Sequence, residues 1–485
     1  MNTDNYRIIF RNKLNIYSFW KLMMKKGLLI LMFAVWMVGA ANLRAADSSR
    51  YPPSGPLLLS NIKVIDGMGH AAAPMRDVFI QDGRISRIAI AGNIDALPEG
   101  TYKIDGTGLT VMPGLIDAHV HIANVGFKPG EFERRDLPGM DRALRAHLYA
   151  GVTTVLELGG DMERSIQLRD EISAGSRLGP TVITVGDTIH SLKTPATAFD
   201  LPSTETRSEI SQLLKAREAV GIDIIKLYVG ITPWEARHIM IEAKKRNMRG
   251  IADFWCTNLS RTVFEVSMID SYAHGGCRKI TREEAKWMRE NGKFAIATLA
   301  LFETMGGQRV FDDYPHRGFA SNSLIVDVLG KETIEDYYSA FHTLRESFEE
   351  GENSLYNSQH FGDLTHLLPD NMHNVKLMYE EGVTVGMGTD AAFPPGTWPG
   401  EAMHRELELH VQAGIPPLDA IRMATFNNAV LLRREQVIGS VESGKIADLL
   451  IVKGDPSSDI SDTRDIVHIV KGGKLINRSE LAFRK

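Results

Sequence analysis

Eight short apolar runs recur through the middle of this 485-residue chain, and helix-like stretches separate most of them. Two of those stretches read SEISQLLKAREAVG and EEAKWMRENG. Strands that alternate with helices favour a parallel sheet with helical crossovers. Eight such units over roughly 300 residues predict an α/β fold, a (β/α)8 TIM barrel. The runs span residues 111–122, 152–158, 180–186, 223–230, 249–255, 268–275, 293–300 and 383–390.

Both ends of the chain carry a different pattern, in which short runs alternate apolar and polar residues. The dipeptides Asp82-Gly83 and Gly472-Gly473 stand at tight-turn positions between such runs, which indicates β-hairpins. The two ends therefore predict a small composite β-sandwich built from residues 47–111 and 437–485. Residues 112–436 remain for the barrel.

The N-terminus has the pattern of a secretory signal peptide. Lys25 and Lys26 precede the apolar run Gly27–Ala41, and small residues follow it. The run is about 15 residues long, short of the roughly 20 that a spanning helix needs, so a membrane anchor is the less favoured alternative. We predict a signal peptide over residues 1–46, with residues 1–23 a spurious extension, and a periplasmic or secreted protein.

Charge and cysteine content exclude two classes of protein, those that bind nucleic acid through a basic surface and those built on a disulfide scaffold. The net charge of −5 and the pI near 6.3 lack the basic excess of a nucleic-acid surface. Only two cysteines are present, Cys256 and Cys277, too few for a disulfide scaffold. An oxidising compartment permits one bridge between them. Cys256 as a metal-binding thiolate is a further alternative, less favoured than a disulfide or an inert thiol.

Polar residues with metal-binding chemistry stand where the predicted barrel strands end. His119 and His121 lie one residue apart at the end of the first run, so they project from one strand face. Lys226 lies in the fourth run, His274 ends the sixth, and Asp390 ends the eighth. Active sites of such barrels lie at these strand ends. The combination indicates a divalent metal site.

On these motifs the chain resembles the amidohydrolase superfamily, the metal-dependent hydrolases related to imidazolonepropionase and prolidase-like enzymes. The resemblance extends from about Leu57 to Ile476, nearly the whole mature chain. It is carried by VMPGLIDAHVHI, GVTTVLELGG, DIIKLYVG, MIDSYAHGG, VTVGMGTDAA and IGSVESGKIADLLIVKGDP.

The resemblance implies a set of metal ligands. His119 and His121 would hold one metal ion together with Asp390. Lys226 would be carboxylated by CO2, and the resulting carbamate would bridge two metal ions, the second of them bound by His274. One or two divalent ions are expected, zinc first and manganese as the alternative.

The family has a histidine on the fifth strand, and this chain has none there. Counting back from His274 by the family's usual gap reaches Asp253, in the apolar stretch RGIADFWCTN. A buried carboxylate needs a partner, and its oxygen can bind zinc or manganese. Asp253 as the replacement ligand is one hypothesis. Three alternatives remain open. The enzyme could bind a single metal ion with Asp253 hydrogen-bonded nearby, Asp253 could be a structural capping group, or the site could be inactive.

The expected activity is hydrolysis of a carbon–nitrogen bond in a small molecule, an amide, cyclic amide, N-acyl amino acid or dipeptide. A metal-bound hydroxide would attack, and Asp390 would act as general base and then protonate the leaving amine. A lactonase or other ester hydrolase is the alternative within enzymes. A deaminase is disfavoured, because such relatives usually lack the strand-four lysine. A non-catalytic ligand-binding descendant is the competing class.

Substrate-binding residues are harder to predict. Tyr228 lies two residues after Lys226 on the same face, and either a hydrogen bond to the substrate carbonyl or packing would explain it. We expect His190 in a solvated loop, with a position that reaches into the site as the less favoured alternative, and His404 on the surface. Residues 301–375 are long for a barrel connection and form either a lid or a contact in a homo-oligomer. Its polar and aromatic candidates are Arg309, His316, Tyr337, Tyr338, His360 and His366.

Overall fold

The computed structural model describes most of the chain between residues 55 and 482. Within that span it leaves out residues 95, 123–136, 191–206, 229–230, 254–264, 277, 306–321, 332–333, 335–363 and 392–396. The described residues belong to one compact unit, Pro52–Lys485. The signal peptide, both cysteines and most of the 301–375 insertion lie outside the described residues, so those expectations stay predictions.

The fold is mixed α/β, and each of the eight predicted runs contains a parallel strand, as expected. Two sheets hold these strands, one of order β6-β7-β8 and the other of order β13-β12-β11-β10-β9. The strands are β6 (Leu115–Val120), β7 (Val152–Glu157), β8 (Thr181–Thr184), β9 (Ile224–Leu227), β10 (Arg249–Ala252), β11 (Ser271–Ala273), β12 (Phe294–Ala297) and β13 (Thr384–Met387).

The two parallel sheets approach each other at both edges. Single parallel bridges join Ile189 to Leu227 and Val120 to Ala391, without a continuous ladder at either place among the described residues. β6, β7, β9 and β12 are buried along their whole length. Parallel strands covered on both faces are expected to lack the alternation of apolar and polar residues. β12 is apolar throughout, whereas β6, β7 and β9 also bury polar residues, among them Asp117, His119 and Lys226.

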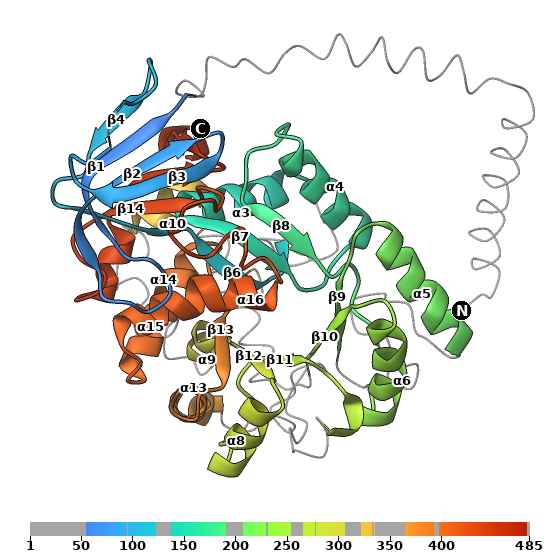
Figure 1. Cartoon of the computed structure of the whole chain (residues 1–485). Coiled ribbons are helices and arrows are strands. Elements are labelled where there is room, and N and C mark those ends of the chain that lie inside the picture. Colours follow the sequence, from blue (N-terminus) through green and yellow to red (C-terminus); the bar gives the residue numbers. More distant parts are fainter. Residues whose placement is uncertain are drawn as a thin grey trace, which may run out of the picture. The chain divides into compact units, whose positions relative to one another are not determined.

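Helices connect the strands and pack against them, on the outside of the sheets in Figure 1. α3 contacts β7, α4 contacts β8, α6 contacts β10 and α13 contacts β13. The helices are α3 (Leu137–Tyr149), α4 (Met162–Ser173), α5 (Arg207–Ala219), α6 (Pro233–Lys244), α8 (Arg282–Glu290), α9 (Leu299–Met305), α10 (Ser323–Leu329), η5 (Leu364–His366), α13 (Leu367–Glu380), α14 (Glu401–Gln412), α15 (Pro417–Arg422), η6 (Met423–Asn427), α16 (Asn428–Leu431), η7 (Ile460–Arg464) and α17 (Arg478–Leu481).

An eight-stranded sheet joins the two ends of the chain. Its path is β16-β15-β14-β5-β1-β2-β3, and β4 pairs with β1. Figure 1 shows the C-terminal strand β14 lying among the blue N-terminal strands. The strands are β1 (Leu57–Val64), β2 (Ala73–Gln81), β3 (Arg84–Ile90), β4 (Tyr102–Asp105), β5 (Leu109–Pro113), β14 (Leu449–Lys453), β15 (Ile466–Lys471) and β16 (Lys474–Ile476).

The turns and boundaries of this sheet follow its local sequence. Asp82 and Gly83 have φ of 53° and 78°, and Gly472 and Gly473 have 55° and 77°, as two-residue hairpin turns require. The run predicted as one strand over residues 111–122 is divided. Its first part is β5, in the terminal sheet, and its second part is β6, in a parallel sheet.

The helix that follows the strand of Lys226 begins with a capping box. Thr232 accepts a hydrogen bond from the backbone N–H of Glu235, and the Glu235 side chain accepts one from the N–H of Thr232. Pro233 occupies the first turn, where its missing N–H costs nothing. This capping box fixes the start of α6.

Replacing Thr232 with Ala is expected to loosen the first turn of α6. The loss of an N-cap hydroxyl costs about 0.5–2 kcal/mol of helix stability. Hydrogen exchange followed by mass spectrometry should show faster exchange in the first turn of α6. Thr281→Ala is the matched control, because Thr281 caps α8 with the same box through Glu284 and its effect should stay in α8. Unchanged exchange in α6 would contradict the capping role.

None of the helices in the described part of the chain is both long and apolar enough to cross a bilayer.

Candidate metal centre

Two histidines at the end of β6 point their Nε2 atoms at the same place. His119 is fully buried and His121 nearly so, and their Nε2 atoms are 3.3 Å apart. His121 donates from Nδ1 to the carbonyl oxygen of Gly159 at 2.7 Å, so its Nε2 carries the lone pair when the ring is neutral. Burial, with the Lys226 ammonium adding to it, lowers the pKa of His119 well below its ordinary value.

Asp390 completes this first group. Its Oδ1 lies 3.3 Å from His119 Nε2 and 3.1 Å from His121 Nε2. Although burial opposes the charged imidazole, the Asp390 carboxylate raises the pKa of His121 above its ordinary value. The backbone of Asp390 is left-handed, with φ of 55°, and its N–H donates to the carbonyl of His119 at 2.8 Å.

Lys226 and Asp253 form a buried ion pair on neighbouring strands. The Nζ of Lys226 is 2.9 Å from Asp253 Oδ2 and 3.4 Å from His119 Nε2. Neither side chain of the pair is more than 2% exposed. Burial alone would raise the pKa of Asp253, but the nearby Lys226 and His274 hold it well below its usual range. The Asp253 carboxylate, which lies in the apolar stretch RGIADFWCTN, is therefore paired with Lys226 and His274.

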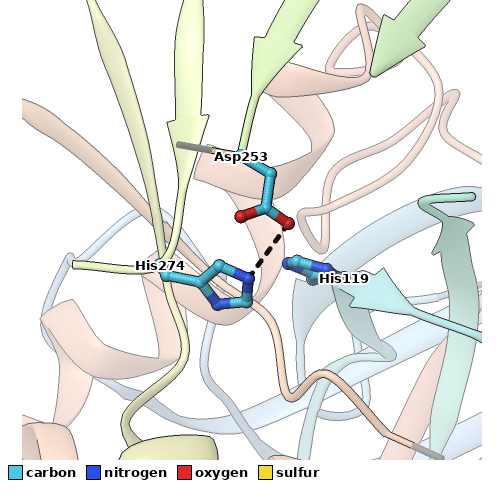
Figure 2. Close-up of side chains that lie close together, drawn as sticks. All are labelled: His119, Asp253 and His274. Atoms are coloured by element: carbon cyan, nitrogen blue, oxygen red, sulfur yellow. Dashed lines mark ion pairs between the residues drawn. The ribbon is translucent and has the colours of Figure 1, made fainter. Parts of the chain in front are cut away.

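His274 approaches Asp253 from the next strand. Its Nε2 is 3.3 Å from Asp253 Oδ2, and its Nδ1 makes a 2.8 Å hydrogen bond with Thr298 Oγ1. Its backbone is left-handed, with φ of 63°. Figure 2 shows His119, Asp253 and His274 pointing toward one another from three different strand ends.

The side chains therefore form two groups that share His119. His119, His121 and Asp390 make one group, and His119, Asp253 and His274 make the other, with ligand atoms within 4.8 Å of one another in each. Asp253 Oδ1 is buried without a hydrogen-bond partner, and Asp390 Oδ1 faces the Nε2 atoms of His119 and His121. Unpartnered carboxylate oxygens beside imidazole lone pairs are costly without a cation. The donor set fits divalent metal ions.

Tyr228 and His190 stand beside this centre. The Tyr228 ring lies 5.1 Å from Lys226 Nζ and 4.9 Å from the His190 ring, and His190 Nε2 is 2.8 Å from Thr188 Oγ1. Burial and Lys226 lower the pKa of His190 to about 4. The expectation of a solvated His190 was wrong, because the Ile189–Leu227 bridge draws this residue in beside β9.

The expectation of a surface His404 was also wrong. His404 is fully buried on α14. Its Nδ1 is 2.9 Å from Thr463 Oγ1, and its Nε2 donates to the carbonyl of Ala150 at 2.8 Å. The side chain ties α14 to the end of α3 and to η7, so its role is structural.

Among the described residues, His366 belongs to neither ligand group. His366 ends η5, directly before α13. The other candidates lie outside the described residues: Arg309, His316, Tyr337, Tyr338, His360, Cys256 and Cys277.

Sequence reasoning assigned no role to Asp117, which lies behind the centre. It is fully buried and accepts hydrogen bonds from His119 N and from both Thr389 N and Thr389 Oγ1. Burial raises the pKa of Asp117 to about 7 in spite of these donors. The signal was available, since a carboxylate inside an apolar strand is the argument that singled out Asp253.

Sequence comparisons point to one family. The family model described as "Amidohydrolase family" matches residues 331–476. An imidazolonepropionase of Thermoanaerobacter pseudethanolicus is 23% identical over 395 residues, covering 77% of this chain and 83% of that protein. An imidazolonepropionase of Geobacillus kaustophilus is 25% identical over 426 residues, covering 82% and 89%.

Solved structures share the fold. A putative prolidase from Bifidobacterium longum superposes with a TM-score of 0.67 at 22% identity, covering 88% of this chain and 95% of that one. A Xaa-Pro dipeptidase with bound methionine gives 0.66 at 24% identity, covering 87% and 100%. The chain is thus similar to the amidohydrolase family over residues 331–476 and to imidazolonepropionases over most of its length, and it shares its fold with prolidase-like structures.

Proposed function

We propose that this protein is a metal-dependent hydrolase that cleaves a carbon–nitrogen bond in a small amide or cyclic amide. The observation that carries the proposal is the pair of histidine–aspartate groups that share His119 and have Lys226 between them. Imidazole and carboxylate at strand ends form the usual ligand chemistry of hydrolytic zinc sites. A centre with this composition is suited to hydrolysis.

The eight parallel strands are proposed to form a (β/α)8 barrel over residues 112–436. The two bridges at the sheet edges support closure in the order β6 to β13. Ile224 and Ile251, two residues before Lys226 and Asp253, belong to a buried apolar cluster with residues of β6, β7, β11 and β12. Such a cluster is what the filled interior of a barrel beneath its active site requires.

The terminal strands are proposed to form a small β-sandwich from residues 47–111 and 437–485. The eight-stranded sheet encloses an apolar core of its own, with side chains from strands of both termini, including Leu59, Ile80 and Ile451. Gly83, in the β2–β3 turn, lies against Gly473, in the β15–β16 turn, where a Cβ would come within 2.5 Å. The two far ends of the strand path therefore meet, as in a sheet folded onto itself.

His119, His121 and Asp390 would hold one metal ion, and Asp253 and His274 would hold the second. Lys226 is proposed to carry a CO2-derived carbamate between them. A carbamate beside Asp253 puts two carboxyl groups in contact, and a divalent cation between them offsets their repulsion. Zinc suits the three imidazoles, and the additional carboxylate also suits manganese.

A metal ion bound by these residues would supply an activated water and would polarise the scissile carbonyl. Asp390 Oδ1 lies where it can take the proton of the attacking water and then deliver it to the leaving amine. Tyr228 stands beside Lys226 and orients the substrate carbonyl through its hydroxyl. Thr298 and the Gly159 carbonyl hold the rings of His274 and His121 in place.

The names of the relatives define the first substrates to test. The similar sequences are imidazolonepropionases, and the similar structures include a Xaa-Pro dipeptidase, so a cyclic amide and an amide next to proline are the starting points. We also propose that residues 1–46 direct the protein to the periplasm or outside the cell, so the substrate would be an external compound.

Metal removal tests the function. Protein purified with zinc and bicarbonate is assayed on imidazolone, Xaa-Pro dipeptide, N-acyl amino acid and lactone panels before and after chelation. We expect hydrolysis of a substrate with a carbon–nitrogen bond. Chelation should abolish this activity, because the proposed attacking water is activated by the metal, and adding zinc or manganese should restore it. Activity confined to lactones would favour the esterase alternative. Metal binding without turnover of any panel member would favour a ligand-binding protein.

A further inference from the structure

The Asp390 backbone is held in a conformation that a non-glycine residue rarely adopts. Its φ of 55° places it in the left-handed region, which is costly unless the surroundings enforce it. The position of its carboxylate between His119 and His121 depends on that conformation. Whatever holds the residues on either side of Asp390 therefore decides the geometry of the first ligand group.

The residue before Asp390 is bound to Asp117 at two points. Thr389 donates from Oγ1 to Asp117 Oδ2 at 2.6 Å and from its N–H to Asp117 Oδ1 at 3.1 Å. The same Oδ1 accepts the N–H of His119 at 3.2 Å. One carboxylate thus joins the backbone that carries His119 to the backbone that carries Asp390, across 272 residues of chain.

The Thr389 hydroxyl also makes a hydrogen bond with the residue that follows Asp390. While it donates to Asp117, it accepts the N–H of Ala391 at 3.1 Å. Ala391 in turn accepts the N–H of His121 at its carbonyl, at 3.1 Å. Hydrogen bonds therefore join the residues on both sides of Asp390, Thr389 and Ala391, to β6 and to the residue that follows it. They hold the left-handed turn at Asp390 from both sides.

Stability alone gives no reason for this arrangement. Asp117 and Thr389 are fully buried, and a buried carboxylate is costly to desolvate even when it is hydrogen-bonded. Apolar residues of similar size often serve stability as well or better. Asp117 also lies outside both groups of ligand atoms, so it acts through the backbone of its neighbours.

We propose that Asp117 and Thr389 form a positioning clamp that sets the geometry of the His119–His121–Asp390 metal site. The inference rests on the proposed function, since it concerns how well that site binds its metal. Outer groups that orient metal ligands typically contribute 10–100-fold to metal affinity. The clamp makes such a contribution by holding Asp390 in its left-handed turn.

The test compares two changes at Thr389 with a matched control. Thr389→Val removes the hydroxyl and keeps the shape, and Thr389→Ser keeps the hydroxyl. Thr425→Val is the control, because Thr425 is equally buried and donates its hydroxyl to the carbonyl of Ile421 at 2.7 Å. Zinc dissociation constants are measured by chelator competition, with thermal unfolding and the visible absorption of the cobalt-substituted proteins alongside.

Thr389→Val is expected to weaken zinc binding by about 10–100-fold and to change the cobalt spectrum. Thr389→Ser and Thr425→Val should keep the zinc affinity and spectrum of the unmodified protein, whatever their effect on thermal unfolding. Should Thr389→Val fail to fold, Asp117→Leu carries the test, because Leu can accept none of the hydrogen bonds that Thr389 and His119 donate to Asp117.

Unmodified affinity and spectrum in a folded Thr389→Val protein would overturn the clamp alone. Equal weakening in Thr389→Val and Thr425→Val would also overturn it, since the effect would then be one of stability. Absence of bound metal in the unmodified protein is a different outcome, which overturns the proposed function and the clamp with it.

Discussion

Asp390→Asn is expected to lower kcat by about 10²–10⁴-fold, the contribution of a positioned general base. Asn has the shape of Asp but cannot take a proton from the attacking water. Asn also tolerates the left-handed backbone that this position requires, so the fold should persist. Turnover on the identified substrate, circular dichroism and metal content of the reconstituted protein check the prediction.

Asp77→Asn is the control for this change. Asp77 is also a buried carboxylate, and it accepts the backbone N–H groups of Asn61 and Gly92 in the terminal sheet, apart from the centre. The Asp77→Asn variant should have the kcat of the unmodified protein. Turnover retained by Asp390→Asn with a normal metal content would remove Asp390 from proton transfer and leave it as a ligand only.

Asp253→Ala is expected to lose one of two bound metal ions and to be strongly destabilised. The change removes a ligand of the second site and leaves Lys226 buried without its 2.9 Å partner. Breaking a buried ion pair by removing one partner costs about 3–5 kcal/mol. Elemental analysis of protein purified with zinc or manganese and bicarbonate gives the stoichiometry. Thermal unfolding of the metal-free protein without bicarbonate, in which Lys226 is an ammonium, gives the change in stability.

Asp253→His distinguishes loss of a ligand from loss of charge. It restores the residue type that the resemblance leads one to expect on the fifth strand, so the second metal should be retained although the carboxylate is gone. Equal metal content in the unmodified and Asp253→Ala proteins would show that Asp253 is not a ligand. One ion in each would make the centre mononuclear, with Asp253 serving to neutralise Lys226.

The strands could be predicted because their signal is local. Buried parallel strands are rich in apolar residues, so each could be recognised from a few consecutive residues. The ends of parallel strands meet at one edge, which is why His119, Lys226, His274 and Asp390 could be expected together from the sequence. The resemblance to a known family, and not strand geometry, added Asp253 to this group. The structure brings these five side chains into one cluster.

The errors concern residues whose surroundings come from distant parts of the chain. His404 is buried because Thr463 and Ala150 supply its two hydrogen-bond partners, and nothing near it in sequence indicates either. His190 is drawn in by the bridge between Ile189 and Leu227. The contact of Asp117 with Thr389 spans 272 residues, so local pattern could reveal the unusual carboxylate and not its partner.

The sheet that joins both ends of the chain has a consequence during synthesis. Thr110, on β5, donates its hydroxyl to the carbonyl of Gly454, 344 residues later, and β5 pairs along its length with β14. At typical rates of elongation the partner strand is made roughly 20–70 s after β5. For that time the edge of β5 has no neighbour on one side, and an open strand edge invites pairing with other chains. The nascent protein therefore needs protection until its last fifty or so residues are complete, and the terminal sheet is the last part to close.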